Sequence, residues 1–217
     1  MAYDLVIKNG SIIDGSGNPW FKADIGVSQG RISKMGKIQG EGDRVIDARG
    51  LMVSPGFIDL HTHNELTLMI NPEADKLKMG VTTEIVGTCG VSAAPVRKDR
   101  FEELRVAFCT VGGGYGFFLD HPRVDWEWST FGEFMEKLED LDLSVNVGSY
   151  VGHLNLRIAT SGLFSERASK EEITEMEGLV EEAMENGAYG LSTALSYVNA
   201  DTEEIIKLCS VVSKYGG

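Results

Sequence analysis

Two histidines separated by one residue carry the strongest chemical signal in the sequence. His61 and His63 follow a short apolar run, and residues two apart on a β-strand project from the same face. Two imidazoles that converge at a strand end suit a borderline-soft ion such as zinc. Two histidines that only satisfy local hydrogen bonds would have the same spacing, so the pair alone leaves both interpretations open.

The three cysteines lie in different settings. Cys89 ends another apolar run, between Gly87 and Gly90, where a strand end would expose its side chain. This setting distinguishes Cys89 from an ordinary lone cysteine, which is usually a small buried hydrophobe. Cys109 and Cys209 lie on expected helices and are predicted to be small buried hydrophobes. An odd number of widely spaced cysteines favours a reducing cytoplasm over a disulfide framework.

Three further side chains are candidates for a place near a site. His153 ends a third apolar run, and its position fits either a pocket residue or a structural hydrogen bond to a neighbouring loop. His121 lies in an Asp-His-Pro loop and is predicted to be solvated. Glu65 is predicted to orient His61 or His63 from behind.

Beyond residue 54, short strands alternate with helices, which predicts a parallel sheet with right-handed crossovers. Ser169 and Glu172 form a capping box that begins a helix at 170–186, and another helix begins near Asp201. A glycine-rich stretch at 112–116 is predicted to be a long loop. In a closed barrel of such units, the C-terminal strand ends hold the active site. The strands are expected at 57–61, 82–87, 145–151 and 188–193.

Residues 1 to about 52 consist of short strands separated by glycine turns, which predicts a small all-β unit. The first strand is expected to turn back at Asn9-Gly10. Five short strands bury little on their own, so this unit is predicted to need a partner surface or further strands.

The formal net charge is −13, from 20 Lys plus Arg and 33 Asp plus Glu. Such a surface repels phosphate, which argues against nucleic acid and anionic membranes as partners. We expect neither a signal peptide nor a membrane span from the apolar runs, and we expect a cytoplasmic location.

Three segments resemble one known family. The string Pro-Gly-Phe-Ile-Asp-Leu-His-Thr-His at 55–63 is similar to the metal-binding signature of the amidohydrolase superfamily. The segments at 14–19 and 80–90 resemble its N-acyl-D-amino-acid deacylase (D-aminoacylase) branch. The resemblance implies an α/β chain that forms the first half of a (β/α)8 metal-dependent hydrolase barrel. In this view residues 54–217 are its first four βα units, and residues 1–53 are part of a small β-sandwich completed by missing C-terminal strands.

The resemblance also implies a site and an activity. His61, His63 and Cys89 would bind Zn²⁺, and His153 would lie near the substrate pocket, in a segment similar to the family's Gly-His-x-x-Leu-Arg element. Activated water would hydrolyse the amide bond of a small-molecule N-acyl-D-amino acid. The general base and two more histidine ligands are expected beyond residue 217. The chain alone is therefore expected to be inactive and to pair with the C-terminal half of the same polypeptide.

Two alternatives remain open at this point. A cyclic-amide hydrolase of the dihydroorotase or dihydropyrimidinase kind would have a lysine near the end of the fourth strand, where 191–195 reads Leu-Ser-Thr-Ala-Leu. A non-catalytic interaction protein could use the same fold, since fold alone does not fix function. No role for Ser192 follows from the sequence.

Overall fold

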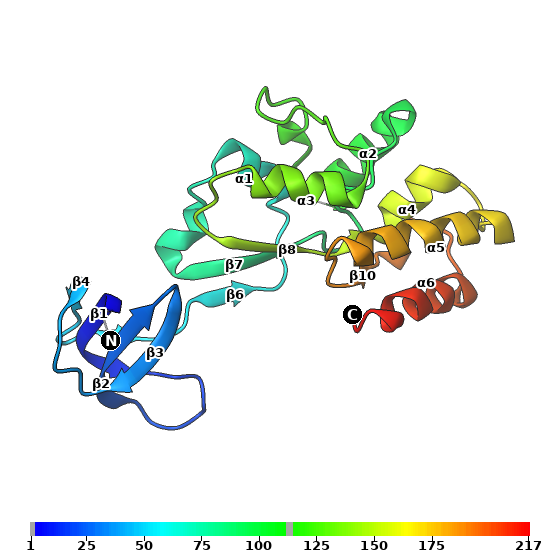
Figure 1. Cartoon of the computed structure of the whole chain (residues 1–217). Coiled ribbons are helices and arrows are strands. Elements are labelled where there is room, and N and C mark those ends of the chain that lie inside the picture. Colours follow the sequence, from blue (N-terminus) through cyan, green and yellow to red (C-terminus); the bar gives the residue numbers. More distant parts are fainter. Residues whose placement is uncertain (1–2, 112–114) are drawn as a thin grey trace. The chain divides into compact units, whose positions relative to one another are not determined.

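The computed structural model describes residues 3–111 and 115–217. The chain divides into two compact units, Met1–Gly56 and Phe57–Gly217 (Figure 1). Of the loop predicted at 112–116, residues 112–114 lie outside the described part. Tyr115–Phe118 forms a short 3-10 helix, η3.

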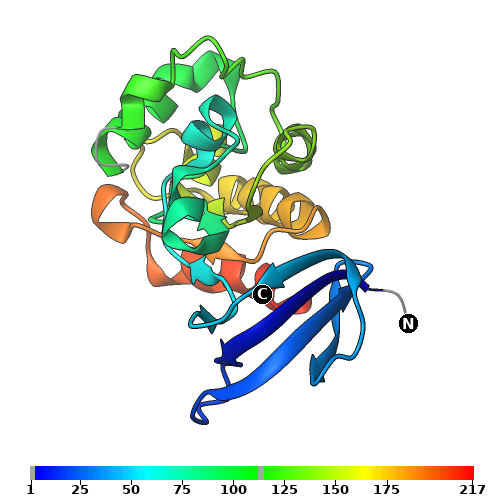
Figure 2. The same ribbon diagram turned by 90° about the vertical axis from the view of Figure 1, so that its left-hand side faces the viewer.

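The first unit is a single twisted sheet, drawn in blue tones in Figure 2. Strand β1 is antiparallel to β2 and parallel to both β4 and β5, while β3 pairs with the outer side of β2. The sheet contains β1 (Tyr3–Ile12), β2 (Phe21–Ser28), β3 (Arg31–Gly36), β4 (Gly42–Asp47) and β5 (Met52–Val53).

The prediction of a turn at Asn9-Gly10 is wrong, because strand β1 continues through both residues. The pairing with β2 shifts register between Ile7 and Gly10, which makes this position a β-bulge. Asn9 has a φ of 63°, a left-handed conformation that serves a bulge as well as a hairpin turn. Its side chain donates a hydrogen bond of 2.9 Å to Asp47 Oδ1, so the bulge is also tied to β4.

The first unit has a small core. Tyr3, Val6 and Ile38 form its buried apolar cluster. Large apolar side chains on β3 and β4 remain exposed: Ile32, Met35, Val45 and Ile46. The sheet therefore buries little by itself, as the sequence predicts.

The second unit alternates strands and helices. Its strands are β6 (Phe57–Asp59), β7 (Val81–Val86), β8 (Asn146–Ser149), β9 (Val151–Gly152) and β10 (Leu191–Ser192). Its α-helices are α1 (Glu65–Ile70), α2 (Phe101–Val111), α3 (Phe131–Glu139), α4 (His153–Thr160), α5 (Lys170–Glu185) and α6 (Thr202–Lys214). Further 3-10 helices are η1 (Asp75–Met79), η2 (Lys98–Arg100) and η4 (Leu195–Tyr197).

The strands of the second unit are parallel neighbours in chain order. Strand β6 pairs with β7, β7 pairs with β8, and β9 pairs with β10, all in parallel. Only Tyr150 separates β8 from β9. The predicted parallel order of the strands at 57–61, 82–87 and 145–151 is therefore confirmed.

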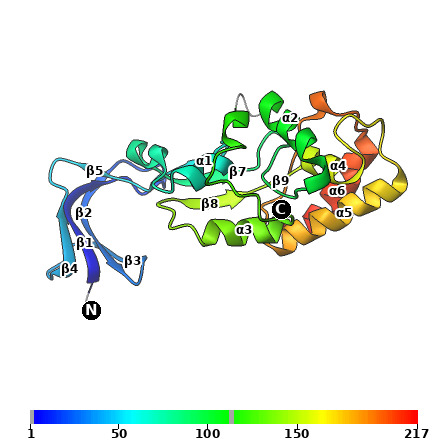
Figure 3. The same cartoon turned by 90° about the horizontal axis from the view of Figure 1, so that it is seen from above.

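Capping residues in the sequence correctly predict where the two C-terminal helices begin. Ser169 and Glu172 form both hydrogen bonds of the predicted capping box at the start of α5. The Asp201 side chain accepts the Glu204 amide hydrogen and so caps α6. Figure 3 shows α5 and α6 lying side by side, and the Tyr215 hydroxyl after α6 is 3.3 Å from a carboxylate oxygen of Glu185 on α5.

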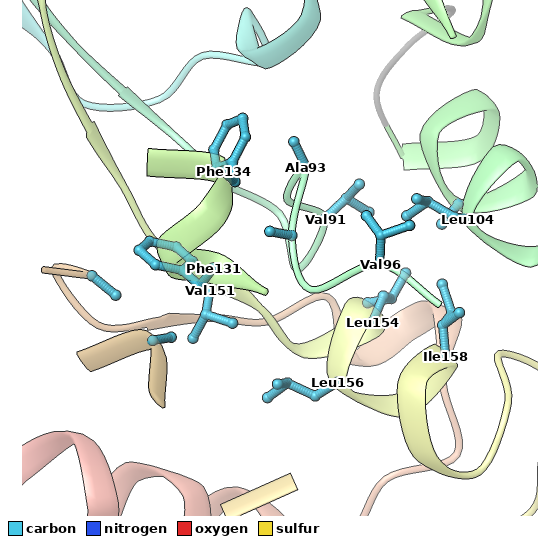
Figure 4. Close-up of a cluster of buried hydrophobic side chains, with 14 of the residues drawn as sticks. Val91, Ala93, Val96, Leu104, Phe131, Phe134, Val151, Leu154, Leu156 and Ile158 are labelled. Carbon is cyan, nitrogen blue, oxygen red and sulfur yellow. The ribbon is translucent and has the colours of Figure 1, made fainter. Parts of the chain in front are cut away.

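The core of the second unit gathers around the segment that follows β7 (Figure 4). Val91, Ala93 and Ala94 are fully buried there, and Trp128 donates its indole hydrogen to the Ala93 carbonyl oxygen at 2.7 Å. Side chains from all six α-helices of this unit contribute to the same cluster, among them Leu66, Leu104, Phe131, Phe134, Leu154, Ile158, Met176, Val180 and Leu208. The residues just after Cys89 are thus anchored in the largest apolar cluster.

The predicted burial of two cysteines is wrong. Cys109 and Cys209 are both exposed. Helix α2 buries Leu104, Ala107 and Phe108, and a residue directly after such a stripe turns away from the core.

None of the described helices has the length and apolar character that a membrane span requires.

Candidate metal centre

The structure brings the three predicted ligands together. One potential ligand atom from each of His61, His63 and Cys89 lies within 4.8 Å of the other two. The His61 Nε2 atom is 2.9 Å from the Cys89 sulfur. The two imidazole rings meet edge to face, with centroids 5.7 Å apart. Two nitrogens and a sulfur in this arrangement form a donor set that suits zinc.

Parallel strands account for this convergence. Strand β6 ends at Asp59, two residues before His61, and β7 ends at Val86, three residues before Cys89. Because β6 and β7 are parallel neighbours, their C-terminal ends lie at the same edge of the sheet. Candidate ligands that are 26 to 28 residues apart in the chain therefore meet.

Hydrogen bonds join the two ligand segments directly. The Thr88 hydroxyl donates to the Thr62 carbonyl oxygen at 3.1 Å. Thr62 lies between the two histidines and Thr88 directly precedes Cys89, and both are buried. The Asp59 carboxylate accepts the His61 amide hydrogen at 3.1 Å. The backbone that carries all three donors is thereby fixed.

The turn that carries Cys89 has an unusual backbone. Gly87, Cys89 and Gly90 have φ values of 72°, 52° and 74°. A Cβ atom at Gly87 would lie 2.1 Å from the Tyr150 carbonyl oxygen, so only glycine fits there. A left-handed conformation costs a non-glycine residue about 1–2 kcal/mol. Surrounding contacts must therefore hold Cys89 in this conformation.

A lysine and two carboxylates lie next to the segment that carries the two histidines. Lys76 Nζ is 2.7 Å from Asp59 Oδ2 and 2.5 Å from the Thr62 hydroxyl oxygen. It is also 3.6 Å from Glu84, which is fully buried and accepts a hydrogen bond of 2.7 Å from Asn64. The hydrogen bond from Lys76 lowers the pKa of Asp59. Asp59 is thus held as an anion against the His61 backbone.

Glu65 supports the Cys89 turn. This side chain, predicted to orient a histidine, accepts the Gly87 amide hydrogen at 2.7 Å. Burial raises its pKa to about 7, despite the opposing effect of its backbone hydrogen bonds. Burial also lowers the pKa of His63, and the nearby positive charges of His61 and Lys76 add to this effect.

His153 lies in a different, buried network. Its Nε2 is 2.7 Å from Glu204, and Arg157 donates to the same carboxylate at 2.8 Å. All three side chains are buried, and they join α4 to α6. Among the described residues, the donor cluster does not include His153. His121, predicted to be solvated, is half-buried and accepts the Arg123 amide hydrogen at 3.2 Å.

A family model described as "Amidohydrolase family" matches residues 44–210, which include the whole donor cluster. The chain belongs to the amidohydrolase family. The D-aminoacylase of Alcaligenes xylosoxydans xylosoxydans is 36% identical to this amidohydrolase over 220 residues. That alignment covers 99% of this chain and 43% of the relative.

Two solved structures are similar across nearly the whole chain. A D-aminoacylase matches with a TM-score of 0.83 and 32% identity, over 99% of this chain and 44% of its own. An N-acyl-D-glutamate deacylase from Bordetella bronchiseptica, solved with zinc and a phosphonate inhibitor, matches with a TM-score of 0.82 and 30% identity, with the same coverage. The predicted resemblance to the deacylase branch is confirmed, and the chain spans less than half the length of these relatives.

Several residues that support the site in this amidohydrolase could not be predicted from the sequence. The Asn155 side chain accepts the Ser92 amide hydrogen at 2.9 Å and donates to the Ser92 carbonyl oxygen at 2.7 Å. Ser192 contacts the Cys89 turn across more than 100 positions of sequence. Spacing carries no signal for contacts at such separations. The buried position of Asn155 within helix α4 becomes informative only once the neighbouring strands are placed.

Proposed function

We propose that the protein to which this chain belongs is a zinc-dependent hydrolase of N-acyl-D-amino acids. The convergence of His61, His63 and Cys89 within 4.8 Å is the observation that carries this proposal. A bound Zn²⁺ would supply a Lewis acid and an activated water for amide hydrolysis. The two imidazoles and the thiolate would hold the ion, and the Asp59, Thr62 and Thr88 contacts would keep these donors in place.

The named relatives favour this substrate class. D-aminoacylase and N-acyl-D-glutamate deacylase are the proteins that this chain matches over 99% of its length. The zinc in the second of these supports zinc as the ion here. A cyclic-amide hydrolase of the kind weighed above is disfavoured, because no lysine lies at or just after β10 (Leu191–Ser192). The presence of His61, His63 and Cys89 in one cluster disfavours a non-catalytic interaction protein.

The architecture of the whole protein is part of the same proposal. Residues 54–217 would provide the first four βα units of a (β/α)8 barrel, and residues 1–53 part of a β-sandwich. The general base and further ligands would come from residues outside this chain. A substrate contact by His153 stays a prediction. It is supported by the position of His153 directly after β9, as the first residue of α4, and by its Nδ1, which has no hydrogen-bond partner among the described residues. A cytoplasmic location also stays a prediction, and the free thiols support it.

The test uses the full encoded polypeptide, meaning this chain with any further residues its gene adds. We expect the wild type to contain zinc and to hydrolyse N-acetyl-D-amino acids in preference to their L-enantiomers. Cys89→Ala should lose both zinc and activity, whereas Cys209→Ala should keep both, since Cys209 is exposed on α6. Unchanged zinc content and turnover in Cys89→Ala would overturn the proposal.

A further inference from the structure

One hydroxyl group bridges the two ends of the turn that carries Cys89. The Ser192 hydroxyl donates to the Gly87 carbonyl oxygen at 2.5 Å and accepts the Gly90 amide hydrogen at 3.0 Å. Ser192 belongs to β10, more than 100 residues further along the chain. A single side chain from the fourth strand thus spans the four residues 87–90, with Cys89 inside the span.

This bridge acts on the part of the backbone that needs support. Cys89 has a φ of 52° between two glycines that also have positive φ. The neighbouring contacts each hold one end only. Glu65 accepts the Gly87 amide hydrogen at 2.7 Å, and the Leu154 amide donates to the Gly90 carbonyl oxygen at 2.8 Å. The Ser192 side chain contacts both ends of the turn, so it fixes the distance between Gly87 and Gly90.

The chemistry of the bridge requires a hydroxyl. A serine or threonine hydroxyl donates one hydrogen bond and accepts others through its lone pairs. A carbonyl oxygen and an amide hydrogen are both satisfied by this one group. Alanine offers neither function, and valine has the shape of threonine without its hydroxyl.

We infer that Ser192 is a positioning residue for the Cys89 ligand, an inference that rests on the proposed metal site. By closing the turn at 87–90, it holds Cys89 in the left-handed conformation that places the sulfur 2.9 Å from His61 Nε2. Strand β10 contributes no ligand among the described residues. Its role at this site is to fix the geometry of a ligand that β7 supplies.

The test compares variants of the full encoded polypeptide that differ in one hydroxyl. Ser192→Thr keeps the hydroxyl, and Ser192→Val has the same shape without it. Ser165→Ala is the matched control, because the Ser165 hydroxyl also makes one donated and one accepted hydrogen bond, to Gly162 and from Arg157. The readouts are the dissociation constant for Zn²⁺ and the sulfur-to-cobalt charge-transfer band of the Co²⁺ form. Thermal unfolding of the metal-free proteins reports general stability.

We expect Ser192→Val to bind Zn²⁺ about 10- to 100-fold more weakly, the usual effect of removing a group that orients a ligand. Its charge-transfer band should weaken or shift, because that band reports the Cys89 sulfur. Ser192→Thr should stay close to the wild type in both measurements. Ser165→Ala should leave the band and the zinc affinity unchanged even where it lowers thermal stability.

The possible outcomes distinguish a failure of the Ser192 inference from a failure of the proposed metal site. If Cys89→Ala keeps both the affinity and the band, the metal site itself is wrong. If Cys89→Ala loses them but Ser192→Val does not, the site stands and the positioning role is refuted. Equal losses in Ser192→Val and Ser192→Thr, or equal losses in Ser192→Val and Ser165→Ala, would also refute it. In those cases the hydroxyl bridge is not what holds the sulfur.

Discussion

At the scale of single residues, the candidate site depends on side chains that bind no metal. Thr88 and Thr62 are buried polar residues whose hydrogen bond joins the cysteine turn to the His-x-His segment. Small displacements of a ligand weaken coordination, because each ligand must lie within a narrow range of distances. The groups that fix the backbone are therefore expected to influence the metal affinity of the proposed site.

Thr88→Val tests this bond, since valine has the shape of threonine without the hydroxyl. The Thr62 carbonyl oxygen loses its described donor, and an unsatisfied buried acceptor costs about 1–3 kcal/mol of the free energy of unfolding. We also expect zinc affinity to fall at least ~10-fold. Isothermal titration with Zn²⁺ and urea unfolding measure the two effects. Thr174→Val is the control, because its hydroxyl also donates to a carbonyl oxygen, but on the exposed face of α5. Equal zinc affinity and equal stability of the two variants would show that the Thr88 hydrogen bond does not support the site.

The three candidate ligands were predictable from the sequence because their signals are local. His61 and His63 are two residues apart, and Cys89 lies between glycines at the end of an apolar run. Ser192 and Asn155 were not predictable, because their partners lie 60 to 105 residues away and become neighbours only in the folded sheet.

At the scale of elements, a buried ion pair joins helices α4 and α6. Arg157 on α4 contacts Glu204 on α6 at 2.8 Å, and both side chains are buried. Burial alone would raise the pKa of Glu204, but the His153 hydrogen bond and the Arg157 charge together lower it. The carboxylate thus stays charged in the interior and links two helices that flank α5 in the sequence.

Glu204→Gln should remove this link while keeping the size of the side chain. Arg157 would be left as an uncompensated buried charge, and breaking such a pair costs about 3–5 kcal/mol. Urea unfolding at neutral pH measures the loss. Glu203→Gln is the control, because its carboxylate is exposed and should shift stability by no more than about 0.5 kcal/mol.

The same pair predicts an acid-sensitive contribution to stability. The pKa of Glu204 in the folded chain lies below its unfolded value of 4.5. Its contribution is therefore complete above pH 4.5 and is lost as the pH falls through the lower, folded value. The difference in unfolding free energy between wild type and Glu204→Gln should shrink over that range. A difference that stays constant from neutral pH down to pH 3 would contradict the charged pair.

Helices were easier to predict than strand connections. The capping box at Ser169 and Glu172 is complete within four residues, so the start of α5 followed from the sequence. Asn9-Gly10 has the residues of a hairpin turn, yet it forms a bulge because β1 continues on to pair with β5. An Asn-Gly sequence with Asn9 in the left-handed conformation does not specify whether the strand ends there.

At the scale of the whole molecule, each unit leaves apolar surface uncovered. In the second unit, Phe57, Ile58 and Leu60 around β6 are at least 60% exposed. In the described part of the chain, β6 and β8 are the edge strands of one parallel sheet, and β9 and β10 form a second, two-stranded sheet. Open edges and exposed apolar strands favour association with other chains. The relatives, more than twice as long as this chain, have the length to supply covering strands.

We therefore predict that the 217-residue chain, expressed alone, does not hydrolyse N-acyl-D-amino acids. Its described donors amount to two imidazoles and one thiolate, and a zinc hydrolase also needs a base that takes the proton of the water. Loss of part of a catalytic unit costs several orders of magnitude in rate. Light scattering should show self-association of the isolated chain. Co-expression with any further residues that the gene encodes should restore solubility and turnover. Turnover by the isolated chain at an ordinary enzyme rate of ~10 per second would mean that the base lies among these residues.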